Sequence, residues 1–324
     1  MSIASHADLF PEVNDFLTRR PLGGVIGGQT VESSSGATFE TVDPGSAETI
    51  TEVHGMQADD VDRAVAAAAT AFAETPWATM PVNERGAMLL RLVEAVEDRK
   101  PIFAQLEALD CGKIHAQAEG DVDNFVATMR YFVELTQHVP LRVPLAVPRH
   151  EAWIARQPWG PCAFIFPWNF PLLLAGWGTA PALAAGNTVV VKPAEDTPLS
   201  TIYLALLAKE VGIPDGVINV VPGLGEVTGA ALAAHPGIKR MSFTGSPEVG
   251  RLVGEACGRN LVPAKLELGG KGAAVVFDDV DVEQTAAALT GAITFHTGQV
   301  CCDATRWIVH ESIYDRFVEA CGER

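Results

Sequence analysis

Two adjacent thiols, Cys301 and Cys302, follow a glycine turn at the end of a helical pattern, in the segment FHTGQVCC, residues 295–302. Cysteine is the most nucleophilic side chain available, and a thiolate attacks carbonyl carbon readily. Adjacent side chains point in different directions, so we expect only one of the pair to face a cleft. The other cysteines are expected to be small buried hydrophobic side chains: Cys111, Cys162, Cys257 and Cys321.

An asparagine lies where an apolar strand pattern ends and a helical pattern begins, in PWNFP, residues 167–171. Ligands of open α/β sheets usually bind at the carboxyl ends of strands. The amide of Asn169 could therefore donate a hydrogen bond to a developing oxyanion. Alternatively, Asn169 only caps the helix that follows. The sequence leaves both interpretations open.

One carboxylate stands between two leucines just before a diglycine, in LELGGK, residues 266–271. A carboxylate in an apolar setting has its pKa raised towards the range useful for a general base. On the alternative interpretation, Glu267 is turned to solvent on an edge strand. Both interpretations remain open.

Charged side chains end another apolar strand, in GNTVVVKPAE, residues 186–195. Lys192 could reach a ribose or phosphate oxygen, and Glu195 could accept hydrogen bonds from two ribose hydroxyls. A solvated strand end is the more common explanation for a lone lysine or glutamate.

Two glycine-containing turns are candidate anion sites. In FTGSPEVG, residues 243–250, Ser246 fits the N-cap of a helix and Pro247 its first position, and such a helix N-terminus suits a pyrophosphate. An ordinary capped helix has the same residues. The segment GLGEVTG, residues 223–229, has GxGxxxG spacing and an acidic residue, which makes it a weak dinucleotide fingerprint.

Alternating strand and helix patterns must position these residues. From Cys162 onward the alternation predicts a parallel sheet with helices on both faces, which is an α/β fold. From Ala58 to about Glu134 the pattern is helical and includes one run over 84–109. Between His138 and Pro158, prolines interrupt short strand patterns, which favours an exposed ribbon that mediates assembly. After residue 268 we expect one more strand, a helix over 282–295, the strand WIVH and a helix from residue 314.

Composition excludes several classes of protein. The chain has 324 residues, of which 48% are apolar, so it can bury one large core or two linked ones. A formal charge of −17 repels nucleic acids and anionic lipid surfaces. The cysteines form neither a disulfide framework nor a CxxC pair, which favours a reducing cytoplasm and gives no reason to expect a metal site.

Two segments bear on membranes and export. Residues 159–191 carry no charge, but four prolines interrupt them, so we expect buried strands and a helix instead of a membrane span. The opening MSIASHADLF lacks the basic and apolar regions of a secretory signal.

The segments PWNFP, GNTVVVKPAE, FTGSPEVG, LELGGK and GQVC, in this order and spacing, resemble the aldehyde dehydrogenase superfamily. The resemblance extends from about Leu22 to the end of the sequence. EALDCGK, residues 107–113, and WIVHESIYDRF, residues 307–317, are most similar to the betaine and amino-aldehyde branch. The implied fold is a Rossmann-like parallel sheet with flanking helices.

The resemblance also implies roles for individual residues. Cys301 would be the nucleophile, with Cys302 as its neighbour, and Asn169 and the backbone N–H of Cys301 would form the oxyanion hole. Glu267 would be the general base. Lys192 and Glu195 would hold the adenosine ribose of NAD, and Glu195 would repel the 2′-phosphate of NADP. The other implied cofactor contacts are Phe166, Pro167, Trp168, Gly225, Gly229, Phe243, Gly245, Ser246, Val249 and Leu268, with Gly245 and Leu268 near the nicotinamide.

The implied reaction oxidises an aldehyde to a carboxylic acid. The Cys301 thiolate adds to the aldehyde, hydride passes to the nicotinamide, and water activated by Glu267 releases the acid from a thioester.

The resemblance predicts three parts of the chain: an NAD-binding domain over 1–137 and 159–268, an oligomerisation ribbon over 138–158, and the opening part of a catalytic domain over 269–324. Family members continue through a Glu-x-Phe-Gly-Pro motif that nothing here matches, so the catalytic domain is expected to be incomplete. The full-length form would be a homodimer or homotetramer acting on a small-molecule aldehyde.

Two alternatives belong to other functional classes. The chain could be a catalytically silent nucleotide-binding or subunit-association protein that keeps the cofactor cleft. It could also be a thiol hydrolase or acyltransferase that uses Cys301, for which His296 is the only nearby histidine partner in sequence.

Overall fold

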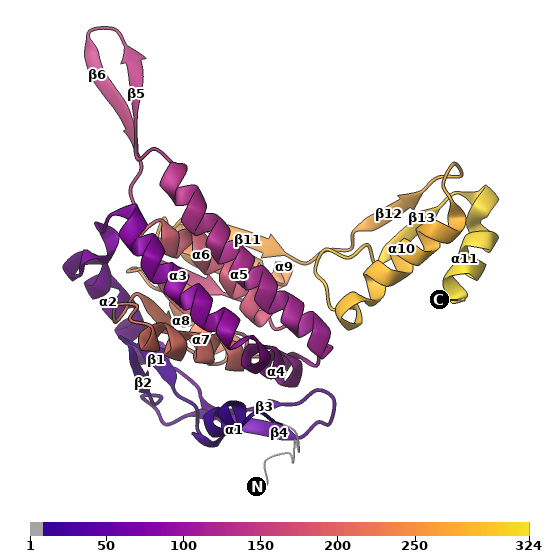
Figure 1. Ribbon diagram of the computed structural model, residues 1–324, viewed down its shortest axis with the longest axis horizontal. Coiled ribbons are helices and arrows are strands. Elements are labelled where there is room, and N and C mark those ends of the chain that lie inside the picture. Colours follow the sequence, from indigo (N-terminus) through magenta and orange to yellow (C-terminus); the bar gives the residue numbers. More distant parts are fainter. Residues whose placement is uncertain (1–8, 324) are drawn as a thin grey trace.

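The computed structural model describes residues 9–323 (Figure 1). The expectation about a secretory signal rests largely on residues 1–8 and lies outside the described part of the chain. Within residues 9–323, no helix has both the length and the apolar character that a membrane span requires.

A seven-stranded sheet in the order β11-β10-β7-β8-β9-β1-β2 forms the centre of the fold. Its strands from β7 to β11 are parallel, whereas β1 and β2 add an antiparallel edge. The bounds are β1 Gly24–Ile26, β2 Gln29–Val31, β7 Pro161–Ile165, β8 Thr188–Lys192, β9 Ile218–Val220, β10 Arg240–Gly245 and β11 Ala264–Leu268. The expected parallel α/β sheet is confirmed, and its strand order reverses between β7 and β10, where open α/β sheets bind ligands.

Helices cover both faces of the sheet because both faces of its strands are apolar. On β7, Cys162 and Phe164 belong to one buried cluster, and Ala163 and Ile165 belong to the other. The first cluster includes residues of α3 (Val82–Asp98), α4 (Lys100–Cys111), α5 (His115–His138), α6 (Pro171–Ala184) and α7 (Leu199–Glu210). The second includes residues of α2 (Ala58–Glu74), α8 (Ala230–Ala234) and α9 (Pro247–Arg259).

The helical run expected over 84–109 is interrupted, so that prediction was wrong in its continuity. Helix α3 ends at Asp98 and α4 begins at Lys100, with Arg99 between them at φ −101° and ψ 20°. Pro101 lies in the first turn of α4, where its missing N–H costs nothing; inside a continuous helix it would remove a hydrogen bond and clash with a carbonyl.

A two-stranded ribbon of β5 (Arg142–Val147) and β6 (His150–Ala155) projects from the body of the molecule (Figure 1). Most of its residues are exposed, and the Arg142 guanidinium lies 3.6 Å from the ring centroid of Trp153. The expected exposed ribbon is confirmed, and its role in assembly stays a prediction.

The C-terminal segment has a small core of its own and extends from the sheet domain (Figure 1). Strands β12 (Ala273–Val276) and β13 (Arg306–Val309) pair in parallel, and α10 (Val282–Thr294) and α11 (Tyr314–Gly322) pack with them. The opposite face of this pair leaves Val275 and Ile308 exposed. The remaining elements are α1 (Pro11–Thr18), β3 (Thr38–Val42), β4 (Thr49–His54), and the short turns η1 (Pro76–Ala78), η2 (Gly225–Gly229), η3 (Phe295–Gly298) and η4 (Glu311–Ile313).

Candidate active site

Asn169 lies in the loop between β7 and α6 and is buried, with 7% of its surface exposed. Its Nδ2 donates a hydrogen bond to the backbone oxygen of Gln299, at 2.7 Å. Helix α6 has Phe170 as its N-cap and no side-chain cap of its own. The capping interpretation of Asn169 is therefore wrong, because its amide points to the segment that carries Cys301.

Carboxylates from α4 cap the helices that follow the two candidate site loops. The backbone N–H of Leu172 donates to Glu107 Oε1 at 3.0 Å, and that of Leu199 donates to Asp110 Oδ2 at 2.9 Å. Neither α6 nor α7 has a side-chain cap within its own sequence, so side chains of α4 accept the hydrogen bonds that their first turns donate. Lys113 pairs with Glu107 at 3.0 Å, and burial raises the pKa of Asp110 well above its ordinary value.

A left-handed turn leads from α10 to the two thiols. His296, Thr297 and Gly298 have φ values of 48°, 58° and 76°, and Val300 then packs against the larger core cluster. Cys301 and Cys302 are both exposed. The turn runs along the surface and turns neither thiol into the core, and the expectation that only one of them faces a cleft stays a prediction.

The electrostatic setting of Cys301 opposes ionisation. Partial burial, the neighbouring Cys302 and the charge of Glu267 raise the pKa of the Cys301 thiol. Deprotonation of this thiol therefore benefits from a base nearby. Cys111, Cys162 and Cys257 are buried, as expected, and burial raises the pKa values of Cys111 and Cys162 to about 12 and that of Cys257 above its ordinary value. Cys321 is only half-buried.

Glu267 is exposed on β11, an edge strand of the described sheet. The apolar setting suggested by its flanking leucines is wrong, because β11 has a neighbour on one side only and Leu266 is itself exposed. Glu267 pairs in register with Thr244 of β10. It is close enough to Cys301 for its charge to raise the pKa of the Cys301 thiol. The fold thus brings together the three residues that the sequence singled out for chemistry.

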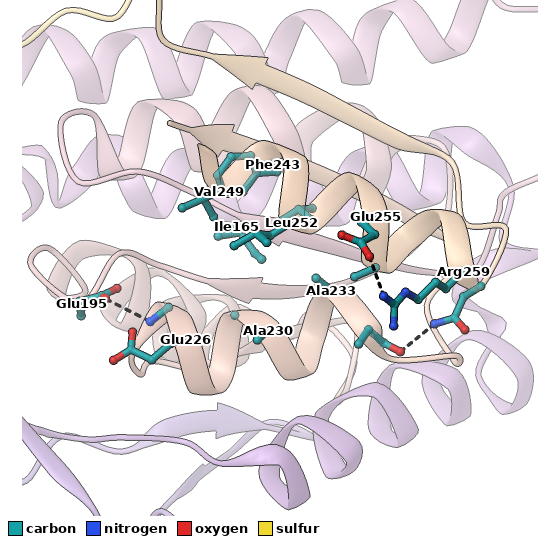
Figure 2. A pocket seen from close by; sticks show the side chains of 16 residues that line it. Ile165, Glu195, Glu226, Ala230, Ala233, Phe243, Val249, Leu252, Glu255 and Arg259 are labelled. Carbon is teal, nitrogen blue, oxygen red and sulfur yellow. Dashed lines mark hydrogen bonds and ion pairs between the residues drawn. The ribbon is translucent and has the colours of Figure 1, made fainter. Parts of the chain in front are cut away.

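A cavity of about 680 Å³ lies between η2 and α8 on one side and α9 on the other, with Ile165 and Phe243 from the sheet beside it (Figure 2). Five predicted cofactor residues line it: Glu195, Gly225, Gly229, Phe243 and Val249.

Lys192 and Glu195 form an ion pair at one end of this cavity. Lys192 Nζ lies 2.6 Å from Glu195 Oε2, and the N–H of Gly225 donates to Glu195 Oε1 at 3.1 Å. Burial alone would raise the pKa of Glu195, but Lys192 and these hydrogen bonds outweigh it and hold the pKa below its ordinary value. Lys192 is only 2% exposed, so the interpretation as a simple solvated strand end is wrong for this residue.

The other predicted cofactor residues lie outside the lining of this cavity. Phe166 is buried and stacks on Phe164, with ring centroids 5.7 Å apart, whereas Trp168 is exposed. Ser246 caps α9 as expected, accepting a hydrogen bond from the N–H of Val249 at 3.2 Å. The remaining four residues lie at strand ends or in the β7–α6 loop: Pro167, Lys192, Gly245 and Leu268.

The sequence prediction missed much of the cavity wall. Helix α9 presents Val249, Leu252, Val253 and Ala256 to it, a spacing that marks one apolar face of a helix and could have revealed them. Arg259 pairs with Glu255 at 2.6 Å at the far end (Figure 2). Among residues 9–323, no three His, Cys, Asp or Glu side chains are grouped so that they could hold a metal ion.

Comparison with known proteins decides the family. A model of the aldehyde dehydrogenase family matches residues 30–324. The chain belongs to the aldehyde dehydrogenase family. It is 43% identical to the mitochondrial benzaldehyde dehydrogenase of Antirrhinum majus, over 93% of this chain and 57% of that protein.

Solved aldehyde dehydrogenases share the fold of this family member. The NAD⁺ complex of the Bacillus cereus enzyme has a TM-score of 0.93 and 36% identity, over 98% of this chain and 64% of that one. A betaine aldehyde dehydrogenase variant of Staphylococcus aureus, also with NAD⁺, has a TM-score of 0.91 and 34% identity, over 94% of this chain and 62% of that one. The chain thus spans 57–64% of the length of these three proteins.

Proposed function

We propose that this chain oxidises an aldehyde to a carboxylic acid with NAD, through a thiohemiacetal and then a thioester on Cys301. The observation that carries the proposal is that Asn169 bonds to the turn before Cys301 and that Glu267 lies close enough to raise the pKa of its thiol, although the three are far apart in sequence. The same sheet carries the Lys192–Glu195 pair at one end of the cavity. Membership of the aldehyde dehydrogenase family supports the reaction class.

The cavity fits a dinucleotide by the chemistry of its walls. Apolar side chains of α9 suit an adenine ring, and the Glu195 carboxylate and Lys192 ammonium suit ribose hydroxyls. Glu195 would repel a 2′-phosphate, which favours NAD over NADP. When bound, NAD would supply the acceptor for the hydride. The NAD⁺ complexes of the two similar structures support this choice of cofactor.

The residues of the chain would act in a fixed order. The Cys301 sulfur forms a bond to the aldehyde carbon while its proton passes to the Glu267 carboxylate. The Asn169 amide and the Cys301 backbone N–H donate hydrogen bonds to the resulting oxyanion. After oxidation, Glu267 first releases the proton that it took from Cys301 to solvent. It then accepts a proton from the water that attacks the thioester, the C–S bond breaks with the electron pair going to the Cys301 sulfur, and the acid leaves.

We assign the parts of the chain to this function as follows. Residues 1–137 and 159–268 form the NAD-binding domain, 138–158 the oligomerisation ribbon, and 269–324 the first part of the catalytic domain. The ribbon would join subunits into a homodimer or homotetramer of the full-length form in the cytoplasm.

A second candidate function is NAD binding or subunit association without turnover. The cavity with Glu195 in its wall and the exposed Val275 and Ile308 support it, because neither feature requires chemistry at Cys301. A thiol hydrolase based on a Cys301–His296 pair has less support. Within residues 9–323 no hydrogen bond joins these two side chains, and the His296 ring instead contacts the backbone oxygen of Asn169.

The test combines calorimetric titration with NAD and a spectrophotometric assay of NADH formed from propanal, benzaldehyde or betaine aldehyde. The dehydrogenase is supported if the wild type turns over, the Cys301→Ser variant does not, and the Cys302→Ser variant still does. NAD binding without turnover favours the second candidate. Ester hydrolysis that is indifferent to NAD, with neither NAD binding nor oxidation, would replace the proposal with a hydrolase.

A further inference from the structure

The backbone carbonyl of Asn169 is held by two side chains that lie far away in sequence. His296 Nε2 is 2.5 Å from the Asn169 oxygen, and the Cys111 thiol donates to the same oxygen at 3.3 Å. Both donors are buried. The residue expected to hold an oxyanion is therefore restrained through its main chain.

The position of the His296 ring is fixed by its surroundings. The side chain is fully buried, and its ring centroid lies 4.7 Å from that of Phe170. Its Nδ1 has no hydrogen-bond partner, so a neutral ring with its proton on Nε2 satisfies the contact with Asn169. Burial and the charge of Lys113 lower the pKa of His296, which favours the same neutral form.

Gln299 connects the turn that carries Cys301 to both His296 and Asn169. The N–H of Gln299 donates to the backbone oxygen of His296 at 3.0 Å. The backbone oxygen of Gln299 in turn accepts the hydrogen bond from Asn169 Nδ2, at 2.7 Å. Asn169 is thus attached at both its main chain and its side chain to the residues just before Cys301.

We propose that His296 is a positioning residue for the reaction. Its Nε2–H fixes the Asn169 loop against the turn that carries Cys301, and so sets where the Asn169 amide lies relative to the reacting sulfur. His296 acts through Asn169 and takes no part in proton transfer. This inference rests on the proposed function, because it gives Asn169 and Cys301 their proposed roles.

A pair of substitutions separates the hydrogen bond from the packing of the ring. His296→Gln keeps an N–H donor near the Nε2 position, and His296→Phe keeps an aromatic ring against Phe170 but has no donor. Both introduce a non-glycine side chain at the same left-handed φ of 48°, so the backbone strain is matched. Circular dichroism melting of both variants checks that each is folded.

Two reactions of Cys301 then distinguish positioning from folding. With p-nitrophenyl acetate, sulfur bonds to the acetyl carbon, the ester C–O bond breaks, p-nitrophenolate leaves with the electron pair, and the thiol proton passes to Glu267. This acylation passes through an oxyanion, whereas alkylation by iodoacetamide does not. We expect the rate of acylation to fall about tenfold or more in His296→Phe, whereas the rate of alkylation should change less than about twofold. In His296→Gln the rate of acylation should return to near that of the wild type. Equal losses of both reactions would overturn the proposal.

Hydrogen exchange provides a measurement that needs no reaction. We expect the backbone amide of Gln299 to exchange about tenfold faster in His296→Phe than in the wild type, and near the wild-type rate in His296→Gln. Unchanged exchange in His296→Phe would overturn the proposed restraint even if the chain is active. Faster exchange in a chain whose wild type is not acylated at Cys301 would support the restraint while refuting the proposed function.

Discussion

At the scale of single residues, the chemistry depends on how Cys301 loses its proton. Partial burial, Cys302 and Glu267 all raise the pKa of this thiol, so the thiolate form increases only as pH rises above the ordinary cysteine range. A carboxylate near a thiol thus has opposing effects. It disfavours the resting thiolate, yet it can accept the proton when the sulfur attacks.

We predict that Glu267→Gln lowers the pKa of Cys301, because it removes a negative charge that raises it. Iodoacetamide alkylation of Cys301, followed by peptide mass mapping against pH, should show its midpoint at lower pH than in the wild type. Glu248→Gln, which removes an exposed carboxylate from α9, should leave the midpoint unchanged. A midpoint that stays in place in Glu267→Gln would mean that Glu267 does not act on the thiol.

Cofactor choice is also set at the residue scale. Glu195→Gln removes the charge that would repel a 2′-phosphate while keeping a hydrogen-bonding side chain beside Lys192. We predict that the ratio of NAD affinity to NADP affinity, measured by calorimetry, falls about tenfold. A matched substitution at the far end of the cavity, Glu255→Gln, should leave the ratio within about twofold. The prediction fails if both variants keep the wild-type ratio.

At the scale of secondary-structure elements, α4 organises the two candidate site loops. Glu107 and Asp110 receive hydrogen bonds from the first turns of α6 and α7, and Lys113 pairs with Glu107. Those helices start directly after the loops that bear Asn169 and Glu195. The buried carboxylates therefore hold both parts of the site in one geometry.

We predict that Glu107→Gln lowers the free energy of unfolding by about 3 kcal/mol, because it leaves the buried Lys113 without one of its two anions. Urea unfolding followed by circular dichroism measures this loss. The control is Glu97→Gln, which breaks an exposed pair with Arg130 and should cost less than about 1 kcal/mol. Similar losses in the two variants would contradict the special role of the buried carboxylate.

At the scale of the whole molecule, the sheet domain, the ribbon and the C-terminal segment are distinct parts (Figure 1). One face of the ribbon carries Leu145 and Ile154, which are 44% and 46% exposed. Exposed apolar side chains on a projecting pair of strands are typical of an association surface. We therefore expect this face of the ribbon to contact a second copy.

We predict that the chain associates through this face. Sedimentation or light scattering should give a dimer or larger species for the wild type and a smaller species for the double variant Leu145→Asp with Ile154→Asp. Ala146→Asp, on the other face of the ribbon, should retain the wild-type mass. A wild-type mass equal to that of one chain would contradict the prediction.

Sequence patterns predicted the sheet well because its apolar strands and intervening helices follow local periodicities. They also predicted where Asn169, Glu195 and Cys301 lie in the fold, after strands or after a glycine turn, whereas the roles of these residues stay predictions. Contacts across long sequence distances could not be predicted. The Glu107 cap on Leu172 spans 65 positions and the His296 contact with Asn169 spans 127, and no local pattern encodes either. The sequence left open whether Glu267 is exposed, because an edge strand and a central strand can share one sequence.

The central claim is that Cys301 forms the covalent intermediate and Glu267 activates the water that resolves it. The most direct test incubates Glu267→Gln with NAD and propanal at a pH above the thiol midpoint, followed by peptide mass mapping. We predict a propanoyl adduct on Cys301 that needs NAD and is absent from Asn169→Ala. An adduct on Cys302 instead, or no adduct with NAD demonstrably bound, would contradict the account.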